Sequence, residues 1–167
     1  MTHLRAALGS AAFFALAPGV VAGVVPWLLT HWHAHSWWAP LRVAGALLIL
    51  AGVRIVVQAF ARFVVEGVGT PAPVAPTERL VVGGLYRHVR NPMYVAVAAT
   101  IVGQALLLGR AVLFLWAGAF AVAVWSFVRW YEEPTLSRRF GAEYEEYRRG
   151  VPAWRPRLRR RAARGAR

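Results

Sequence analysis

The stretch from Ala6 to Leu29 spans 24 residues without a charged side chain. A helix needs about 20 apolar residues to cross the hydrocarbon core of a bilayer, so this stretch is long enough to span one. It is longer than the apolar region of a typical cleaved signal peptide and no convincing small-residue cleavage site closes it, so we expect it to remain as a span. Further apolar stretches follow. The sequence therefore predicts an all-α, polytopic membrane bundle with spans at about residues 6–29, 41–65, 94–108 and 111–128.

The distribution of arginine predicts the orientation of these spans. All 20 basic residues are arginine, and the net charge is +13. With both termini inside, 17 arginines lie on the inner side and only Arg42 and Arg110 lie on the outer side. Basic residues accumulate in cytoplasmic loops, and tryptophan gathers at membrane interfaces, as it does here between Trp27 and Trp38. We expect an integral protein of a bacterial inner membrane with both termini in the cytoplasm.

The positive charge does not predict nucleic-acid binding. Twelve arginines lie in the last 39 residues, after the final apolar stretch, and no nucleic-acid recognition motif accompanies them. Anionic lipid headgroups are the expected partner of the basic tail, residues 157–167. The chain has no cysteine, which excludes disulfides, thiolate nucleophiles and cysteine-ligated metals.

The segments around the third and fourth spans carry the polar chemistry of a single domain, residues 1–167. Glycine and proline between Glu66 and Pro92 predict a loop. After the fourth span, Pro134 suits a first helical turn, and Gly150 with Pro152 suits a helix end. Four apolar or aromatic residues recur on one face of this expected amphipathic helix, which would lie on the cytoplasmic surface: Leu136, Phe140, Tyr144 and Tyr147.

Three polar residues form a stripe on the second span, because Arg54, Gln58 and Arg62 are spaced by four. Arg62 can reach the inner interface, whereas Arg54 lies deeper in the membrane. An ionised side chain near the bilayer centre costs at least about 2.5–3.5 kcal/mol on insertion scales. Arg54 is therefore expected either to line a wet cavity near a substrate or to pair with backbone carbonyls or Gln104.

Two other polar groups allow both a functional and a structural interpretation. His31, His33 and His35 could converge on a metal, but no carboxylate is nearby and histidine is common at membrane interfaces, so we predict no metal site. Glu132 and Glu133 follow the fourth span and fit either a binding site or ordinary ion pairs and a helix start. The pair Gly83-Gly84 indicates a turn and lacks the spacing of a dinucleotide-binding fingerprint.

Two stretches together carry a family resemblance. The first is ERLVVGGLYRHVRNPMY, residues 78–94, and the second is EEPTLSRRFGAEYEEY, residues 132–147, followed by VPAWRP, residues 151–156. They resemble the integral-membrane methyltransferases that include isoprenylcysteine carboxyl methyltransferases and phospholipid N-methyltransferases. The family pattern has Gly-x-Tyr and Arg-His-Pro-x-Tyr, then a glutamate pair and Phe-Gly-x-x-Tyr-x-x-Tyr. This chain departs from it at Asn91, where histidine is frequent.

The resemblance implies S-adenosyl-L-methionine as cofactor, bound within residues 78–156 at the cytoplasmic ends of the last helices. Arginines at 87 and 90 could hold its carboxylate, and Glu132 or Glu133 could accept from its ammonium or ribose. The binding residues that the resemblance and this chemistry imply are Glu78, Arg79, Leu80, Val81, Tyr86, Arg87, Arg90, Asn91, Pro92, Tyr94, Glu132 and Glu133.

The resemblance further implies methyl transfer to a lipid or isoprenoid-like acceptor in the bilayer. A carboxylate acceptor needs no base and could be positioned by Arg129 or Arg54, so these two and Glu132 are the candidate catalytic residues. An amine acceptor needs a proton acceptor, for which Glu132, Glu133 or His88 are candidates. The alternatives are a sterol-reductase-type membrane reductase using NADPH and a non-enzymatic basic membrane anchor.

Overall fold

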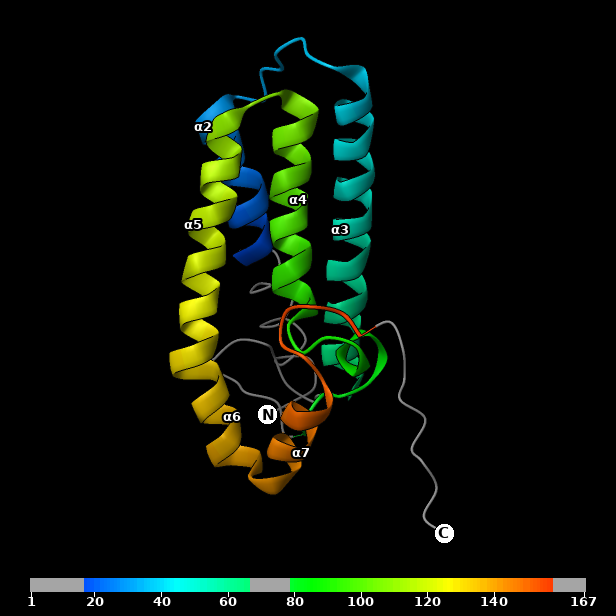
Figure 1. Ribbon diagram of the computed structural model, residues 1–167, viewed down its shortest axis with the longest axis vertical. Coiled ribbons are helices and arrows are strands. Elements are labelled where there is room, and N and C mark those ends of the chain that lie inside the picture. Colours follow the sequence, from blue (N-terminus) through cyan, green and yellow to red (C-terminus); the bar gives the residue numbers. More distant parts are fainter. Residues whose placement is uncertain (1–16, 67–78, 158–167) are drawn as a thin grey trace.

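The computed structural model describes residues 17–66 and 79–157. Within these ranges the chain is helical and contains no strand, which confirms the predicted all-α class. Figure 1 shows the long helices running side by side, with the shorter C-terminal helices gathered at one end. The helical elements in chain order are η1 (Val20–Val24), α2 (Val25–Thr30), α3 (Ala39–Glu66), η2 (Gly84–Arg87), α4 (Pro92–Leu108), α5 (Ala111–Phe127), η3 (Val128–Glu132), α6 (Glu133–Phe140) and α7 (Ala142–Gly150).

The helices coincide with the apolar stretches of the sequence. Two of them, Ala39–Arg62 and the continuous helix Ala111–Phe140, are long and apolar enough to cross a bilayer, and Ala17–Thr30 and Pro92–Leu108 are apolar but shorter. Residues 6–16 of the first predicted span lie outside the described residues, as do residues 67–78 of the predicted glycine- and proline-rich loop and the tail from residue 158 onward.

Small residues allow α3 and α4 to pack closely. A methyl group added at Gly45 would lie 2.5 Å from the carbonyl oxygen of Gly103, and one added at Gly103 would lie 2.8 Å from the carbonyl oxygen of Gly45. Gly52 is seven residues further along α3, and a methyl group there would meet the backbone of α4 near Ala96. Transmembrane helices that approach this closely depend on van der Waals contact between small residues.

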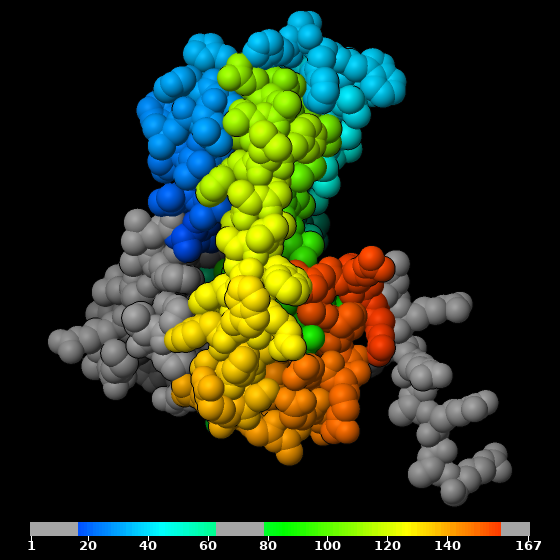
Figure 2. Space-filling view, turned by 60° about the vertical axis from the view of Figure 1, so that its left-hand side comes forward, coloured from blue at the N-terminus to red at the C-terminus, as the bar shows by residue number. Residues whose placement is uncertain are grey.

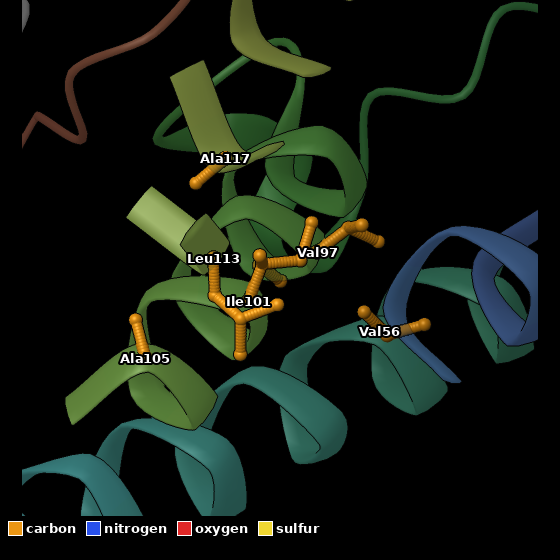
Figure 3. Packing of buried hydrophobic residues seen from close by; sticks show 7 residues of the cluster. Val56, Val97, Ile101, Ala105, Leu113 and Ala117 are labelled. Carbon is orange, nitrogen blue, oxygen red and sulfur yellow. The ribbon is translucent and has the colours of Figure 1, made fainter. Parts of the chain in front are cut away.

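The apolar core is formed mainly between α3, α4 and α5. Ile101 and Leu113 are fully buried in it, and Figure 3 shows the residues that surround them. Since lipid chains are as apolar as these side chains, tight packing holds the helices together in a bilayer more than the exclusion of water does. The cluster comprises Val56, Ala96, Val97, Ile101, Ala105, Leu113 and Ala117.

The π-helical turn η1 connects the first described helix to α4 and α5. Gln104 Nε2 donates to the carbonyl of Ala22 at 2.6 Å, and Trp116 Nε1 donates to the carbonyl of Val21 at 2.9 Å. π-helical turns leave backbone carbonyls available to such donors. Gln104 is thus bound to Ala22 and is not the partner of Arg54, whose side chain is exposed on α3.

The predicted amphipathic helix after the fourth span is two helices rather than one. The π-helical turn η3 joins α5 to α6 without interruption, so the first half continues the fourth span. Gly141 then adopts φ 51° and ψ −124°, and the chain turns back into α7. The left-handed φ suits glycine, which has no side chain to clash with the backbone. As a result, α7 and the following residues lie against the base of the bundle (Figure 2).

Candidate active site

A cavity lies where η2 and the start of α4 meet η3, α6 and α7, at the end of the bundle opposite the connection between α2 and α3 (Figure 1). Its lining combines apolar side chains with one arginine, two glutamates and three tyrosines. The residues that line it are Leu80, Val81, Tyr86, Arg90, Asn91, Val128, Glu132, Glu133, Leu136, Tyr144 and Tyr147.

The 3-10 turn η2 places Tyr86 in this cavity. Gly84 begins the turn with φ 56°, and a methyl group there would lie 3.0 Å from Arg62 Nε. The Gly83-Gly84 pair is therefore a turn, as its sequence indicates. Tyr147 donates to the backbone carbonyl of Tyr86 at 2.7 Å, which ties α7 to η2. Burial raises the pKa of both tyrosine hydroxyls above their ordinary value, so both remain neutral near pH 7.

Among the described residues, Glu132 is bound by a single neutral donor. The hydroxyl of Tyr94 donates to Glu132 Oε2 at 3.1 Å, and among the described residues no arginine lies within ion-pair distance of this carboxylate. Glu132 follows the apolar part of its helix, which ends near Val128. Burial raises the pKa of the Glu132 carboxyl above its ordinary value; the Tyr94 hydrogen bond lowers it, the neighbouring Glu133 charge raises it and the more distant Arg90 lowers it. A partly buried carboxylate with one neutral donor favours a cation as its ligand.

Glu133 is paired with Arg90 instead. Arg90 Nη1 lies 2.7 Å from Glu133 Oε1, with side-chain exposures of 12% and 10%, and also donates to the Tyr144 hydroxyl at 3.1 Å. Arg90 Nε donates to the carbonyl of Val151 at 3.0 Å. Since a partly buried ion pair with further hydrogen bonds is costly to separate, these contacts fix α6, α7 and the chain after α7 around Arg90.

Residues 151–157, called the strap below, are held against Arg90 and Asn91, which line the cavity. The backbone N–H of Arg90 donates to Pro152 at 2.9 Å, and the N–H of Asn91 donates to Ala153 at 3.2 Å. The side chain of Asn91 donates to the same Ala153 carbonyl at 3.3 Å. Asparagine at this position therefore anchors the strap as well as lining the cavity.

The cavity is small in this closed arrangement. Its volume is about 70 Å³, which holds only a few water molecules. This volume is too small for a ligand the size of a nucleoside, so the lining, to which α7 contributes Tyr144 and Tyr147, must move apart for such a ligand to fit. Hydrogen bonds to the carbonyls of residues 151–153 are the contacts that such a movement would break.

The structure brings most of the predicted binding residues together. Seven of the predicted residues line the cavity: Leu80, Val81, Tyr86, Arg90, Asn91, Glu132 and Glu133. Tyr94 reaches Glu132, and Pro92 is buried in the first turn of α4. The predicted partner Glu78 lies outside the described residues.

Four predicted arginines lie away from the cavity, with exposed side chains. Arg79 precedes η2, and Arg87 is its last residue, so the turn directs Arg87 outward where Tyr86 faces inward. Arg129 occupies an exposed position of η3, three residues before Glu132. Arg54 lies on the exposed face of α3. Arg129 and Arg54, the two arginines predicted to position the acceptor, thus do not line the Glu132 cavity.

Four residues of the cavity were not assigned to it from the sequence: Val128, Leu136, Tyr144 and Tyr147. Three of them belong to the predicted amphipathic face, and that shared face was the available signal. It indicated that Leu136, Tyr144 and Tyr147 point the same way. The reversal at Gly141 makes them face η2 and α4 instead of the membrane surface.

The histidines at the opposite end of the bundle each have another partner, and the rings of His31 and His33 also contact each other edge-on, with 6.3 Å between their centroids. His31 packs edge-on against Trp27, His33 Nδ1 lies 3.2 Å from the Thr30 carbonyl, and His35 Nδ1 lies 3.4 Å from Arg110. In the part of the chain that the structure describes, no group of three histidine, aspartate or glutamate residues is arranged to hold a metal.

Comparison with known proteins agrees with the residues at the cavity. The phospholipid methyltransferase family matches residues 41–143, which is more than half of the chain and includes α3, η2, α4, α5 and both glutamates. The chain belongs to this family of methyltransferases. With its apolar helices it is an integral membrane protein.

A curated relative supports the same superfamily. The chain is 38% identical over 77 residues to a protein-S-isoprenylcysteine O-methyltransferase of Schizosaccharomyces pombe. The match covers 44% of this chain and 31% of the relative, so this chain matches less than a third of that relative's length. No solved structure matches the chain.

Proposed function

We propose that this protein transfers a methyl group from S-adenosyl-L-methionine to a lipid-like acceptor embedded in the membrane. The observation that carries the proposal is Glu132, a partly buried carboxylate that faces the cavity and has, among the described residues, only the Tyr94 hydroxyl as a donor. S-adenosyl-L-methionine supplies an electrophilic methyl group on a sulfonium, and it also carries an ammonium. A carboxylate without a cation partner suits either positive group.

The residues of the cavity fit such a donor. Glu132 would bind a cationic group, while the Tyr144 hydroxyl, held by Arg90, is available to donate to an oxygen of the ligand. Leu80, Val81 and Leu136 provide apolar contacts for a base or a methylene chain. Methyl transfer needs no covalent enzyme intermediate, so alignment and the exclusion of water by the strap would be the main contributions of the protein.

The type of acceptor determines what the residues must do. A carboxylate acceptor is already ionised, whereas an amine must lose a proton. Glu133 is bound to Arg90, and His88 is exposed and lines a different hollow, so Glu132 is the candidate base at the cavity. The acceptor would enter laterally from the bilayer.

We further propose that both termini lie in the cytoplasm of a bacterial cell, where the methyl donor is supplied, and that the basic tail binds anionic headgroups.

Binding of S-adenosylhomocysteine to the detergent-purified, full-length protein tests the proposal. Calorimetric titration should show binding that weakens about tenfold or more in Glu132→Gln, because an interaction with a charged partner contributes about 1.5–3 kcal/mol. Glu146→Gln is the matched control, since Glu146 is exposed on α7, and its affinity should not change. Equal affinity of Glu132→Gln and the unchanged protein would remove Glu132 from the site.

Transfer of labelled methyl from S-adenosyl-L-methionine to total membrane lipid then identifies the acceptor. The same titration separates the alternatives. Binding of NADPH without S-adenosylhomocysteine would support a reductase, and binding of neither would support an anchor. The family match favours the methyltransferase.

A further inference from the structure

The helix α3 has two different faces. Gly45, Gly52 and Val56 lie against α4, and the opposite face is exposed at the edge of the bundle (Figure 1). Most of the exposed side chains on that face are apolar, as a surface in contact with lipid requires, but two of them are polar. This outward face comprises Val43, Leu47, Leu50, Ala51, Arg54 and Gln58.

Arg54 lies within the hydrocarbon core of the bilayer. Along α3 it is about 18 Å from Arg42 and about 12 Å from Arg62, at a rise of about 1.5 Å per residue. The core is about 30 Å thick, which matches the separation of Arg42 and Arg62 along the helix. Residues 63–65 are also apolar, and an edge of the core placed beyond them puts Arg54 deeper still.

The guanidinium of Arg54 is not neutralised within the bundle. Its side chain is exposed, and among the residues whose side chains the structure describes it has no hydrogen bond or ion pair. The Cα–Cβ bonds of a helix tilt toward its N-terminus, so this side chain starts toward the farther edge of the core. Ionisable side chains at such depth are almost always paired or face a cavity inside the protein. The outward face gives Arg54 neither, so we expect a partner to cover it.

A second copy of this chain does not complement Arg54. A two-fold contact uses the same surface on both subunits, so a contact through the outward face would bring two like charges toward each other. The chain also has no carboxylate at this depth, because its seven acidic residues all lie outside the apolar stretches. These residues are Glu66, Glu78, Glu132, Glu133, Glu143, Glu145 and Glu146.

A lipid headgroup lies too far from Arg54 to pair with it. Lipid phosphates lie outside the hydrocarbon core, and so more than about 12 Å along the axis from Arg54. A transmembrane helix, in contrast, can present a carboxylate at any depth. Gln58, one turn nearer the inner edge, can donate to the same carboxylate, and the small side chain of Ala51 allows a helix to approach closely.

We propose that the outward face of α3 docks a transmembrane helix of a different membrane protein, one that carries an aspartate or glutamate near the middle of its span. The carboxylate of that helix accepts from the Arg54 guanidinium, and Gln58 donates to it from the next turn. Charge complementarity thus identifies the partner by its chemistry. The inference does not depend on methyl transfer.

Energy transfer in phosphatidylcholine vesicles tests this docking with a synthetic partner. The full-length protein carries a donor dye at Ser36→Cys, and the probe is a leucine-rich transmembrane peptide with one central glutamate and an acceptor dye. We expect this peptide to bind at least about fivefold more tightly than the same peptide with leucine at that position. A glutamate moved two turns from the centre should lose the advantage, because the depth no longer matches Arg54.

Substitutions at two arginines of α3 then identify the contact. Arg54→Leu should abolish the preference for the glutamate peptide, and Arg54→Glu should reverse it in favour of a peptide with a central arginine. Arg42→Leu, at the outer edge of the same helix, is the matched control and should keep the preference. Since Arg54 has no partner among the described residues, Arg54→Leu should unfold at no lower temperature than the unchanged protein.

Several results would overturn the proposal. Equal binding of the glutamate and leucine peptides, or an equal loss in Arg42→Leu, removes Arg54 from the contact. Energy transfer between two labelled copies that Arg54→Leu abolishes would assign the face to a second copy. A preference that disappears when phosphatidylglycerol is added would assign Arg54 to a lipid. Should Arg54→Leu fail to fold, the peptide preference of Arg54→Glu decides. S-adenosylhomocysteine binding retained in these variants separates a failure here from a failure of the proposed function.

Discussion

At the scale of single residues, the charge of Glu132 depends on the balance between burial and one hydrogen bond. Burial raises the pKa of this carboxyl, and the hydroxyl of Tyr94 lowers it. A cationic ligand requires the ionised form. The pKa of Glu132 is raised above its ordinary value of 4.5. Affinity for a cationic ligand should therefore be highest at a pH well above the raised pKa and should fall as the pH decreases through it.

Replacing Tyr94 with phenylalanine should shift this pH dependence. The loss of the hydroxyl leaves Glu132 with no donor among the described residues and removes a contact that lowers the pKa of the carboxyl, so this pKa rises further. Affinity for S-adenosylhomocysteine should fall up to about tenfold at neutral pH and recover at higher pH. Calorimetric titration across pH measures both effects.

Tyr131→Phe is the matched control for this substitution. Tyr131 is exposed and stacks on Phe127, so removing its hydroxyl should leave the pH profile unchanged. A Tyr94→Phe profile that coincides with that of Tyr131→Phe would show that the hydrogen bond to Glu132 does not tune the site.

At the scale of helices, the close packing of α3 against α4 determines the position of η2. Both η2 and the strap are attached near the ends of these helices. A methyl group at Gly45 would lie 2.5 Å from the Gly103 carbonyl and 2.6 Å from the Leu107 nitrogen, and neither backbone atom can move independently of its helix. The two helices would have to separate to accept it.

Gly45→Ala should therefore lower the stability of the protein. Overpacking of this kind costs about 1–3 kcal/mol, and thermal unfolding in detergent should occur several degrees lower. Gly118→Ala on α5 is the control, because no atom lies within 4 Å of the added methyl group, and alanine is favoured over glycine in a helix. Unfolding of Gly45→Ala at or above the temperature of Gly118→Ala would contradict the packing argument.

The elements and much of the site could be predicted from the sequence, because each depended on local signals. Uninterrupted apolar stretches predicted the helices, and two short motifs predicted Tyr94 near Glu132, 38 residues apart in the chain. The reversal at Gly141 could not be predicted from periodicity, since the spacing of apolar residues continues through it. Arg87 and Arg90 looked equivalent in sequence, and only the geometry of η2 separates an exposed arginine from one paired with Glu133.

At the scale of the whole molecule, arginine is distributed unequally between the two ends of the bundle. Arg42 and Arg110 lie at the end with the connection between α2 and α3, while the end with η2, α6 and α7 carries most of the others. The end with more basic residues is retained in the cytoplasm during insertion. The same end carries the Glu132 cavity. Under the proposed function, this end must therefore face the compartment that supplies the methyl donor.

The absence of cysteine from the sequence makes this orientation directly measurable. Ser36→Cys, in the exposed connection before α3, should react with a membrane-impermeant maleimide once the periplasm is accessible. Ala142→Cys, exposed at the start of α7, should react only after the inner membrane is permeabilised. The reverse pattern would place the Glu132 cavity outside the cytoplasm, away from the supply of S-adenosyl-L-methionine. That outcome would contradict the proposed function even if S-adenosylhomocysteine bound in detergent.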